Sequence, residues 1–155
     1  MDNPYSTPKS DIGTLAAAKI IPMYSPNQIT VGAFFGGPLA AVYFLYQNFT
    51  GLNQFDKAQK TLIWGLSLCF IFVCLLPLIP DNFPNTVLPV AYCVAARQLS
   101  IQYQCSKPQI IENDSFTFQS NWRVFVISVA ALLLLMVLVV PVIFAFEMIS
   151  PILAN

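Results

Sequence analysis

The sequence predicts an all-α membrane protein, a bundle of about four transmembrane helices that follows an N-terminal tail. The first observation is composition, because 57% of the 155 residues are hydrophobic and only 9% are charged. A soluble domain carries about 25% charged residues, and a chain this short could not cover a water-facing surface with so few. The second observation is that the apolar residues gather in long runs, of which residues 122–146 form the clearest.

Residues 1–24 form a polar tail that is interrupted by prolines. Asp11 could cap a short amphipathic helix with Ile12 and Ile20 on its apolar face, and such a helix could lie in the membrane interface. The same stretch could equally lack regular structure. The transmembrane bundle is expected to occupy residues 25–155.

The first predicted span covers about residues 28–47, and a capping signal marks its start. Ser25 suits the N-cap and Pro26 suits the first helical position. The side chain of Gln28 can bond back to the amide of Ser25, which completes a capping box. We therefore expect a helix that begins sharply at this point.

The same span contains the triplet Gly36-Gly37-Pro38 near its middle. Pro38 cannot donate a hydrogen bond to the carbonyl of Phe34, so a kink is expected there. Broken helices at the bilayer midplane hold substrate in many transporters. The triplet could thus be a structural kink or part of a transport path.

Small residues recur every four positions along this span and would form a smooth face for another helix. The residues of that face are Gly32, Gly36, Gly37, Ala40 and Ala41. The face could pack within one chain or join two copies, and the two uses are compatible. We expect homo-oligomerisation through it.

The second predicted span, about residues 61–79, ends in a proline-rich turn, so the third span should run antiparallel to it. The third, about residues 85–101, has a short apolar core and could cross fully or turn back inside the membrane. A full crossing is favoured because Arg97 can extend to the interface. Aromatic and basic residues anchor the start of the fourth span, residues 122–146.

Basic residues predict the orientation and a lipid contact. Four of them gather at the face that the four-span arrangement makes cytoplasmic: Lys57, Lys60, Arg97 and Arg123. Both termini would then lie in the periplasm, together with Lys9 and Lys19. The four cations could contact anionic head groups in general or form a specific phospholipid site between helices.

Little in the sequence supports catalysis or metal binding. The chain has no histidine and a net charge of zero, and no carboxylate lies in the middle of a predicted span. A proton relay or a hard-metal site is therefore not expected. Cys69 and Cys74 would point about 140° apart around a helix, too far to share a soft metal. We expect no catalytic residue, metal or cofactor, and no nucleic-acid partner because no basic face is present.

One local pattern is familiar. It consists of Tyr24-Ser25-Pro26-Asn27-Gln28-Ile29, then Phe34-Phe35-Gly36-Gly37-Pro38-Leu39-Ala40-Ala41, and then Gln47-Asn48-Phe49. The pattern resembles the first helix of a group of small, largely uncharacterised bacterial inner-membrane proteins with about four spans. The resemblance implies a location in the bacterial cytoplasmic membrane and implies no reaction.

The sequence thus favours a small non-catalytic inner-membrane protein that forms a homo-oligomer. Its role would be to support cell-envelope or membrane-barrier integrity by binding phospholipids or a larger envelope complex. The alternative is a small oligomeric transporter or channel, with the broken first helix at Gly36-Gly37-Pro38 on its path.

Overall fold

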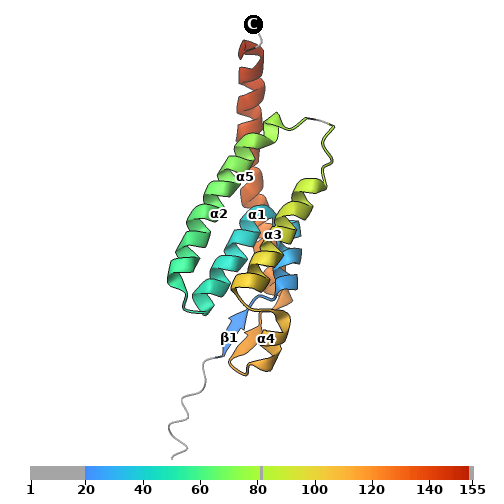
Figure 1. Ribbon diagram of the computed structural model, residues 1–155. Coiled ribbons are helices and arrows are strands. Elements are labelled where there is room, and N and C mark those ends of the chain that lie inside the picture. Colours follow the sequence, from blue (N-terminus) through green and yellow to red (C-terminus); the bar gives the residue numbers. More distant parts are fainter. Residues whose placement is uncertain (1–19, 81, 154–155) are drawn as a thin grey trace, which may run out of the picture.

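The computed structural model describes residues 20–80 and 82–153, which are mostly helical (Figure 1). The elements in order are β1 (Ile21–Met23), α1 (Pro26–Gly51), α2 (Phe55–Leu75), the 3-10 turn η1 (Leu76–Leu78), α3 (Val87–Tyr103), α4 (Lys107–Glu112), β2 (Phe116–Phe118) and α5 (Asn121–Leu153). Most of the predicted tail, residues 1–19, lies outside the described residues.

Three of the described helical stretches are long and apolar enough to cross a membrane: Pro26–Gly51, Phe55–Leu78 and Asn121–Ile149. The prediction of a mostly helical protein with long apolar helices is confirmed. The predicted count of four spans, at about residues 28–47, 61–79, 85–101 and 122–146, is not confirmed. The reason lies in the path of α1 and in the length of α3.

Helix α1 starts with the predicted capping box. The Ser25 hydroxyl accepts a hydrogen bond from the Gln28 amide at 3.3 Å, and the Gln28 side-chain oxygen accepts one from the Ser25 amide at 3.0 Å. The side-chain nitrogen of Gln28 also donates to the carbonyl of Gln119 at 2.7 Å and to Asn121 Oδ1 at 2.8 Å. One glutamine therefore caps α1 and ties it to the start of α5.

The chain reverses direction inside α1, at Gly37. This residue has φ 71° and ψ −170°, a conformation that glycine adopts without steric cost. A straight helix of 26 residues would be about 39 Å long, yet the rings of Tyr24 and Phe44 lie 4.7 Å apart. The expected kink at Pro38 is thus a hairpin, and its halves, residues 26–36 and 38–51, begin and end at the same end of the molecule.

Asn48 holds the two ends of this hairpin together. Its Oδ1 accepts from the Tyr24 amide and its Nδ2 donates to the Tyr24 carbonyl, both at 2.8 Å. Nδ2 also donates to Gln104 Oε1 at 2.9 Å, and Gln104 Nε2 donates to the Leu45 carbonyl at 2.8 Å. Because Asn48 is only 1% exposed, these bonds form a satisfied buried network that also fixes the end of α3.

Strands β1 and β2 pair in parallel, with Ile21 opposite Phe116 and Met23 opposite Phe118. This pairing places the residues before α1 beside those before α5. A small cluster of Met23, Cys105 and Ile110 is buried against the pair. We call the end of the molecule that holds β1, β2 and α4 the basal end, and the opposite end, which holds η1, the distal end (Figure 1).

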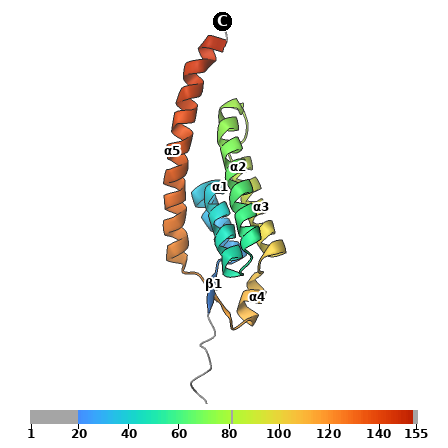
Figure 2. The same cartoon turned by 90° about the vertical axis from the view of Figure 1, so that its left-hand side faces the viewer.

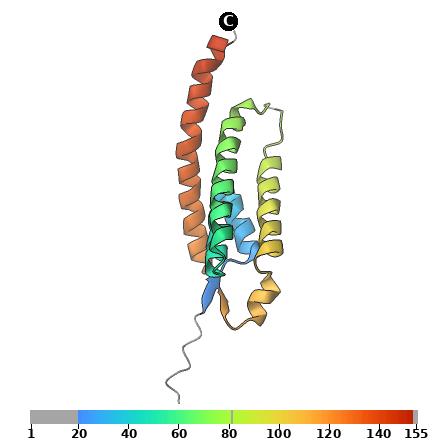
Figure 3. The ribbon, with the colours of Figure 1, turned by 60° about the vertical axis from the view of Figure 1, so that its left-hand side comes forward.

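Helix α1 lies at the centre and packs against α2, α3 and α5. Figure 2 shows that both of its halves lie near the basal end and stop well short of the distal end of α2. Helices α2 and α3 run in opposite directions and are joined at the distal end, and α5 extends beyond them (Figure 3). Most of the core therefore comes from the α1 hairpin.

The structure places a reversal of direction in α1, whereas α3 is one continuous helix that is not among the stretches long enough to cross a membrane. Helix α3 has 17 residues, which gives it a length of about 26 Å. The helix runs from the distal end to the basal end, antiparallel to α2 (Figure 3). A full crossing by this segment would need the same direction. The sequence offered no signal for the reversal beyond the Gly36-Gly37-Pro38 triplet.

Replacing Asn48 with Ala should lower the free energy of unfolding in mild detergent by about 2 to 3 kcal/mol. The reason is that both backbone groups of Tyr24 lose their partner inside the protein. The measurement is a denaturant titration followed by circular dichroism. The matched control is Gln47→Ala, because the Gln47 side chain donates to Tyr43 one turn away in the same helix. Equal stability of the two variants would contradict the role given to Asn48.

Candidate functional site

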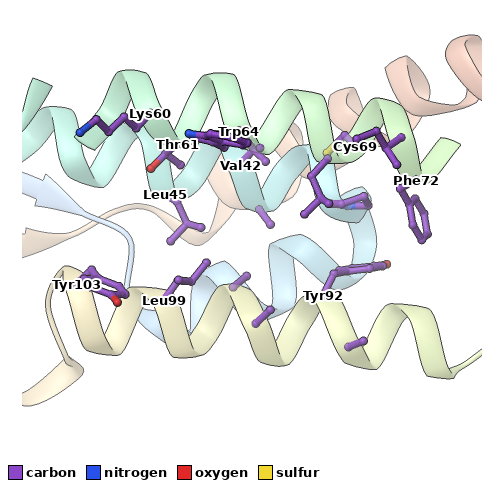
Figure 4. Close-up of a pocket in the computed structure, with 18 of the residues that line it drawn as sticks. Val42, Leu45, Lys60, Thr61, Trp64, Cys69, Phe72, Tyr92, Leu99 and Tyr103 are labelled. Atoms are coloured by element: carbon purple, nitrogen blue, oxygen red, sulfur yellow. The ribbon is translucent and has the colours of Figure 1, made fainter. Parts of the chain in front are cut away.

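A groove of about 720 Å³ lies between the second half of α1, α2 and α3. Its lining is almost entirely apolar, and Figure 4 shows side chains of all three helices turned toward it. Small residues line its middle: Ala41, Gly65, Ala91, Ala95 and Ala96. Larger aromatic side chains stand along it, namely Trp64, Phe72, Tyr92 and Tyr103 (Figure 4).

The groove follows from the way in which the α1 hairpin packs. A Cβ added to Gly65 of α2 would lie 2.5 Å from Val42 Cγ2 of α1, so the two helices touch closely at that point. Helix α3 packs on α1 as well, and α2 and α3 make few contacts with each other. The second half of α1 thus forms the back wall of a space that α2 and α3 leave open between them.

Positive charge marks the basal end of the groove. Lys57 and Lys60, from the first two turns of α2, line this end together with Thr61 and Tyr103. In Figure 4, Lys60 and Thr61 lie at the same end of the groove as Tyr103. Both lysine side chains are exposed, so their flexible stems can follow the apolar wall while the ammonium groups stay in water.

The groove continues toward the distal end. A second cavity, of about 520 Å³, lies beside the segment that joins α2 to α3. It shares Phe72, Leu88 and Tyr92 with the groove, so the two spaces are adjoining. The lining therefore extends from the first turn of α2 to its last.

The other two predicted head-group residues lie elsewhere. Arg97 is exposed on α3 but does not line the groove. Arg123 is in the first turn of α5, a helix that contributes no residue to the groove. It lies near Tyr24, where burial raises the pKa of the phenol and the positive charge of Arg123 opposes that rise. Of the four predicted cations, the structure thus brings only Lys57 and Lys60 to the same cavity.

The predicted small-residue face is covered within one chain. Gly32, Gly36, Gly37, Ala40 and Ala41 are all buried. A Cβ added to Gly36 would lie 2.7 Å from the carbonyl oxygen of Ser128 in α5. Close packing of helices through this face therefore occurs inside one chain, which is the first of the two uses that the sequence allowed.

The tip of the α1 hairpin also meets α5. A Cβ added to Gly37 would lie 2.9 Å from Leu135 Cδ2, so an apolar side chain covers the break. Ser128, the buried polar residue of α5 near the hairpin, donates its hydroxyl to the carbonyl of Val124 at 2.8 Å. Gly37 is therefore covered by α5, whereas Pro38, the next residue of the break, lines the groove.

Among the described residues, no three side chains of the metal-binding types lie together. The four cysteines are free thiols. Burial raises the pKa of the Cys105 thiol, which lies outside the long helices. This thiol is therefore protonated at neutral pH and packs as a small apolar group.

Comparison of the chain with models of protein families, with curated proteins and with solved structures found no match. The functional argument therefore depends on the groove and on the distribution of charge. Sequence reasoning missed the α3 side of the groove. Its lining residues Leu88, Ala91, Ala95, Leu99 and Tyr103 recur at helical spacing, which marks one face but does not separate a groove from a core.

Replacing Gly36 with Leu should destabilise the single chain by about 1 to 3 kcal/mol or more, because the added side chain meets the backbone of Ser128. The measurement combines thermal unfolding with light scattering in mild detergent. Ala130→Leu is the control, since Ala130 is an exposed small residue of α5. A Gly36→Leu variant that keeps its stability but loses an oligomer would show that the face joins copies after all.

Proposed function

We propose that this protein is a non-catalytic integral membrane protein that binds an anionic lipid in the groove between α1, α2 and α3. The observation that carries the proposal is an elongated apolar groove with Lys57 and Lys60 at one end. A lipid has the matching chemistry, since its chain is apolar and its acidic head group attracts ammonium groups. The volume is within the range of about 300 to 1,000 Å³ that ligand pockets occupy.

The proposed orientation places the basal end in the cytoplasm. The described basic residues lie in elements that begin or end there: Lys57 and Lys60 in the first turns of α2, Arg97 in the second half of α3, Lys107 in α4 and Arg123 in the first turn of α5. Lys9 and Lys19 precede β1 in the sequence, and no apolar stretch long enough to cross a bilayer separates them from it. Residues 76–86 and 124–153 contain no Lys or Arg. A single cytoplasmic face for all seven cations satisfies the positive-inside rule.

In this arrangement α2, α3 and α5 cross the membrane, and the α1 hairpin enters from the cytoplasmic face and returns to it. The N-terminus is then cytoplasmic and the C-terminus lies on the other side. This proposal replaces the four-span topology with two periplasmic termini. It rests on the reversal at Gly37, which the four-span count does not include.

The charged end of the groove should determine which lipid binds, because the protein is surrounded by lipid. Burying an apolar chain in the groove gains little over leaving it in the bilayer, because both surroundings are apolar. The preference for one lipid over another must therefore come from the shape of the groove and from the head group of the lipid. Each lysine near an anionic surface contributes about 1 kcal/mol, so Lys57 and Lys60 would set the preference for acidic lipids.

The proposed role is to support the membrane barrier of the bacterial envelope by holding this lipid, alone or within a larger membrane complex. The bacterial location rests on the pattern in residues 24–49. The alternative of a transporter or channel would use the break at Gly36-Gly37-Pro38, of which Gly37 packs against Leu135 and Pro38 lines the groove. Because the lining of the groove is almost entirely apolar, the groove suits a lipid chain better than it suits the passage of polar substrates or ions.

The topology can be tested with single cysteines in a background without other cysteines. Ser6→Cys, in the N-terminal tail, should be protected from a membrane-impermeant maleimide in intact spheroplasts, and Asn85→Cys should be labelled. The two topologies agree on Asn85 and differ only on the tail, so Asn85→Cys is the internal control. Labelling of Ser6→Cys from outside would overturn the hairpin topology.

The double substitution Lys57→Gln/Lys60→Gln should weaken binding of phosphatidylglycerol by about 2 kcal/mol, which is about thirty-fold. The measurement is native mass spectrometry of protein released from nanodiscs that contain phosphatidylglycerol and phosphatidylethanolamine. The control is Arg97→Gln/Lys107→Gln, which removes the same charge from the same face but outside the groove. Equal losses in the two double variants would mean that only overall charge matters.

A further inference from the structure

The groove is longer than one leaflet of a membrane. Its α2 wall extends from Lys57 to Leu75, which is about 27 Å of helix at about 1.5 Å per residue. The hydrocarbon core of a bilayer is about 30 Å thick, so one leaflet supplies about 15 Å. A phospholipid chain that starts at Lys57 and Lys60 would therefore occupy only the basal part of the groove.

The middle of the groove is kept open by small side chains. Gly65 on α2 follows Trp64 in the sequence, and Ala91 and Ala95 on α3 flank the position of Tyr92. Phe72 and Tyr92 belong both to the groove and to the distal cavity. A single flexible chain could thus extend from the cytoplasmic face into the opposite leaflet without leaving the groove.

The charged end favours a simple anionic head. The charged side chains that line the groove are Lys57 and Lys60, and Thr61 adds a hydroxyl beside them. Two ammonium groups and a donor hydroxyl match the oxygens of a terminal phosphate. The back wall is formed by α1, and the lining follows α2 from Lys57 to Leu75. A single long chain can follow this whole length, whereas the chains of a glycerophospholipid end within one leaflet.

We infer that the ligand of the groove is a polyprenyl phosphate, a single chain longer than one leaflet with a phosphate at its end. This inference deepens the proposed lipid binding and rests on it. The phosphate binds at Lys57 and Lys60, and the chain passes Gly65 and Ala91 toward the distal cavity. The length of the chain and its single acidic head group then together distinguish this ligand from the other lipids of the membrane.

The test uses the full-length protein in nanodiscs and measures binding of undecaprenyl phosphate and of farnesyl phosphate by native mass spectrometry. Undecaprenyl phosphate should bind at least about tenfold more tightly and should displace phosphatidylglycerol. Ala91→Phe should remove this preference, because the new ring closes the groove beyond the reach of the short chain. Val90→Phe is the control at the same depth, since Val90 is exposed but does not line the groove.

The outcomes separate the two levels of the proposal. Retention of acidic phospholipids with no preference for the longer prenyl chain would overturn the polyprenyl phosphate and leave lipid binding in place. Equal displacement by an uncharged long-chain quinone would overturn the role of the phosphate. Failure of every anionic lipid to bind more tightly than phosphatidylethanolamine would overturn both.

Discussion

The buried amide of Asn48 is the interaction on which the rest of the structure depends. It pairs with both backbone groups of Tyr24 and with the side chain of Gln104. In an apolar surrounding, an unpaired backbone group costs several kcal/mol, so the return of α1 to its starting point is strongly favoured once this pairing is possible. The same contact fixes the basal end of α3, because Gln104 follows the last residue of that helix. The position of α3 therefore depends on the position of the α1 hairpin.

The groove and the position of β1 both follow from that return. Because α1 turns back at Gly37, its second half stands between α2 and α3 near the basal end and keeps them apart. The same reversal returns the chain to the end of the molecule where β1 and the start of α2 lie, because Tyr24 and Asn48 pair there. One feature of the backbone thus accounts for an apolar space between helices and for the position of β1 at the basal end.

Part of this structure could be predicted from the sequence. The capping box at Ser25 and the break at Pro38 depend on neighbours within four residues, and both are present. The size of the break was not predictable, because a Gly-Pro pair allows either a kink or a reversal. Only a contact between residues far apart, Tyr24 and Asn48, decides between them. Lys57 and Lys60 were predicted to contact head groups, but the groove that they border depends on how three helices pack.

The small residues of α1 show how much local spacing can predict, because it marks a face for close packing but does not name the partner helix. Repeats of small residues every four positions are typical of contacts between separate transmembrane helices. In a hairpin the partner helix belongs to the same chain, so Gly32 faces Phe44 of the returning half and Gly36 faces Ser128 of α5. Close packing there holds the first half of α1 against the returning half at Gly32 and against α5 at Gly36. None of Gly32, Gly36 and Gly37 lines the groove, so these glycines act on it only through the position of the returning half, which forms its back wall.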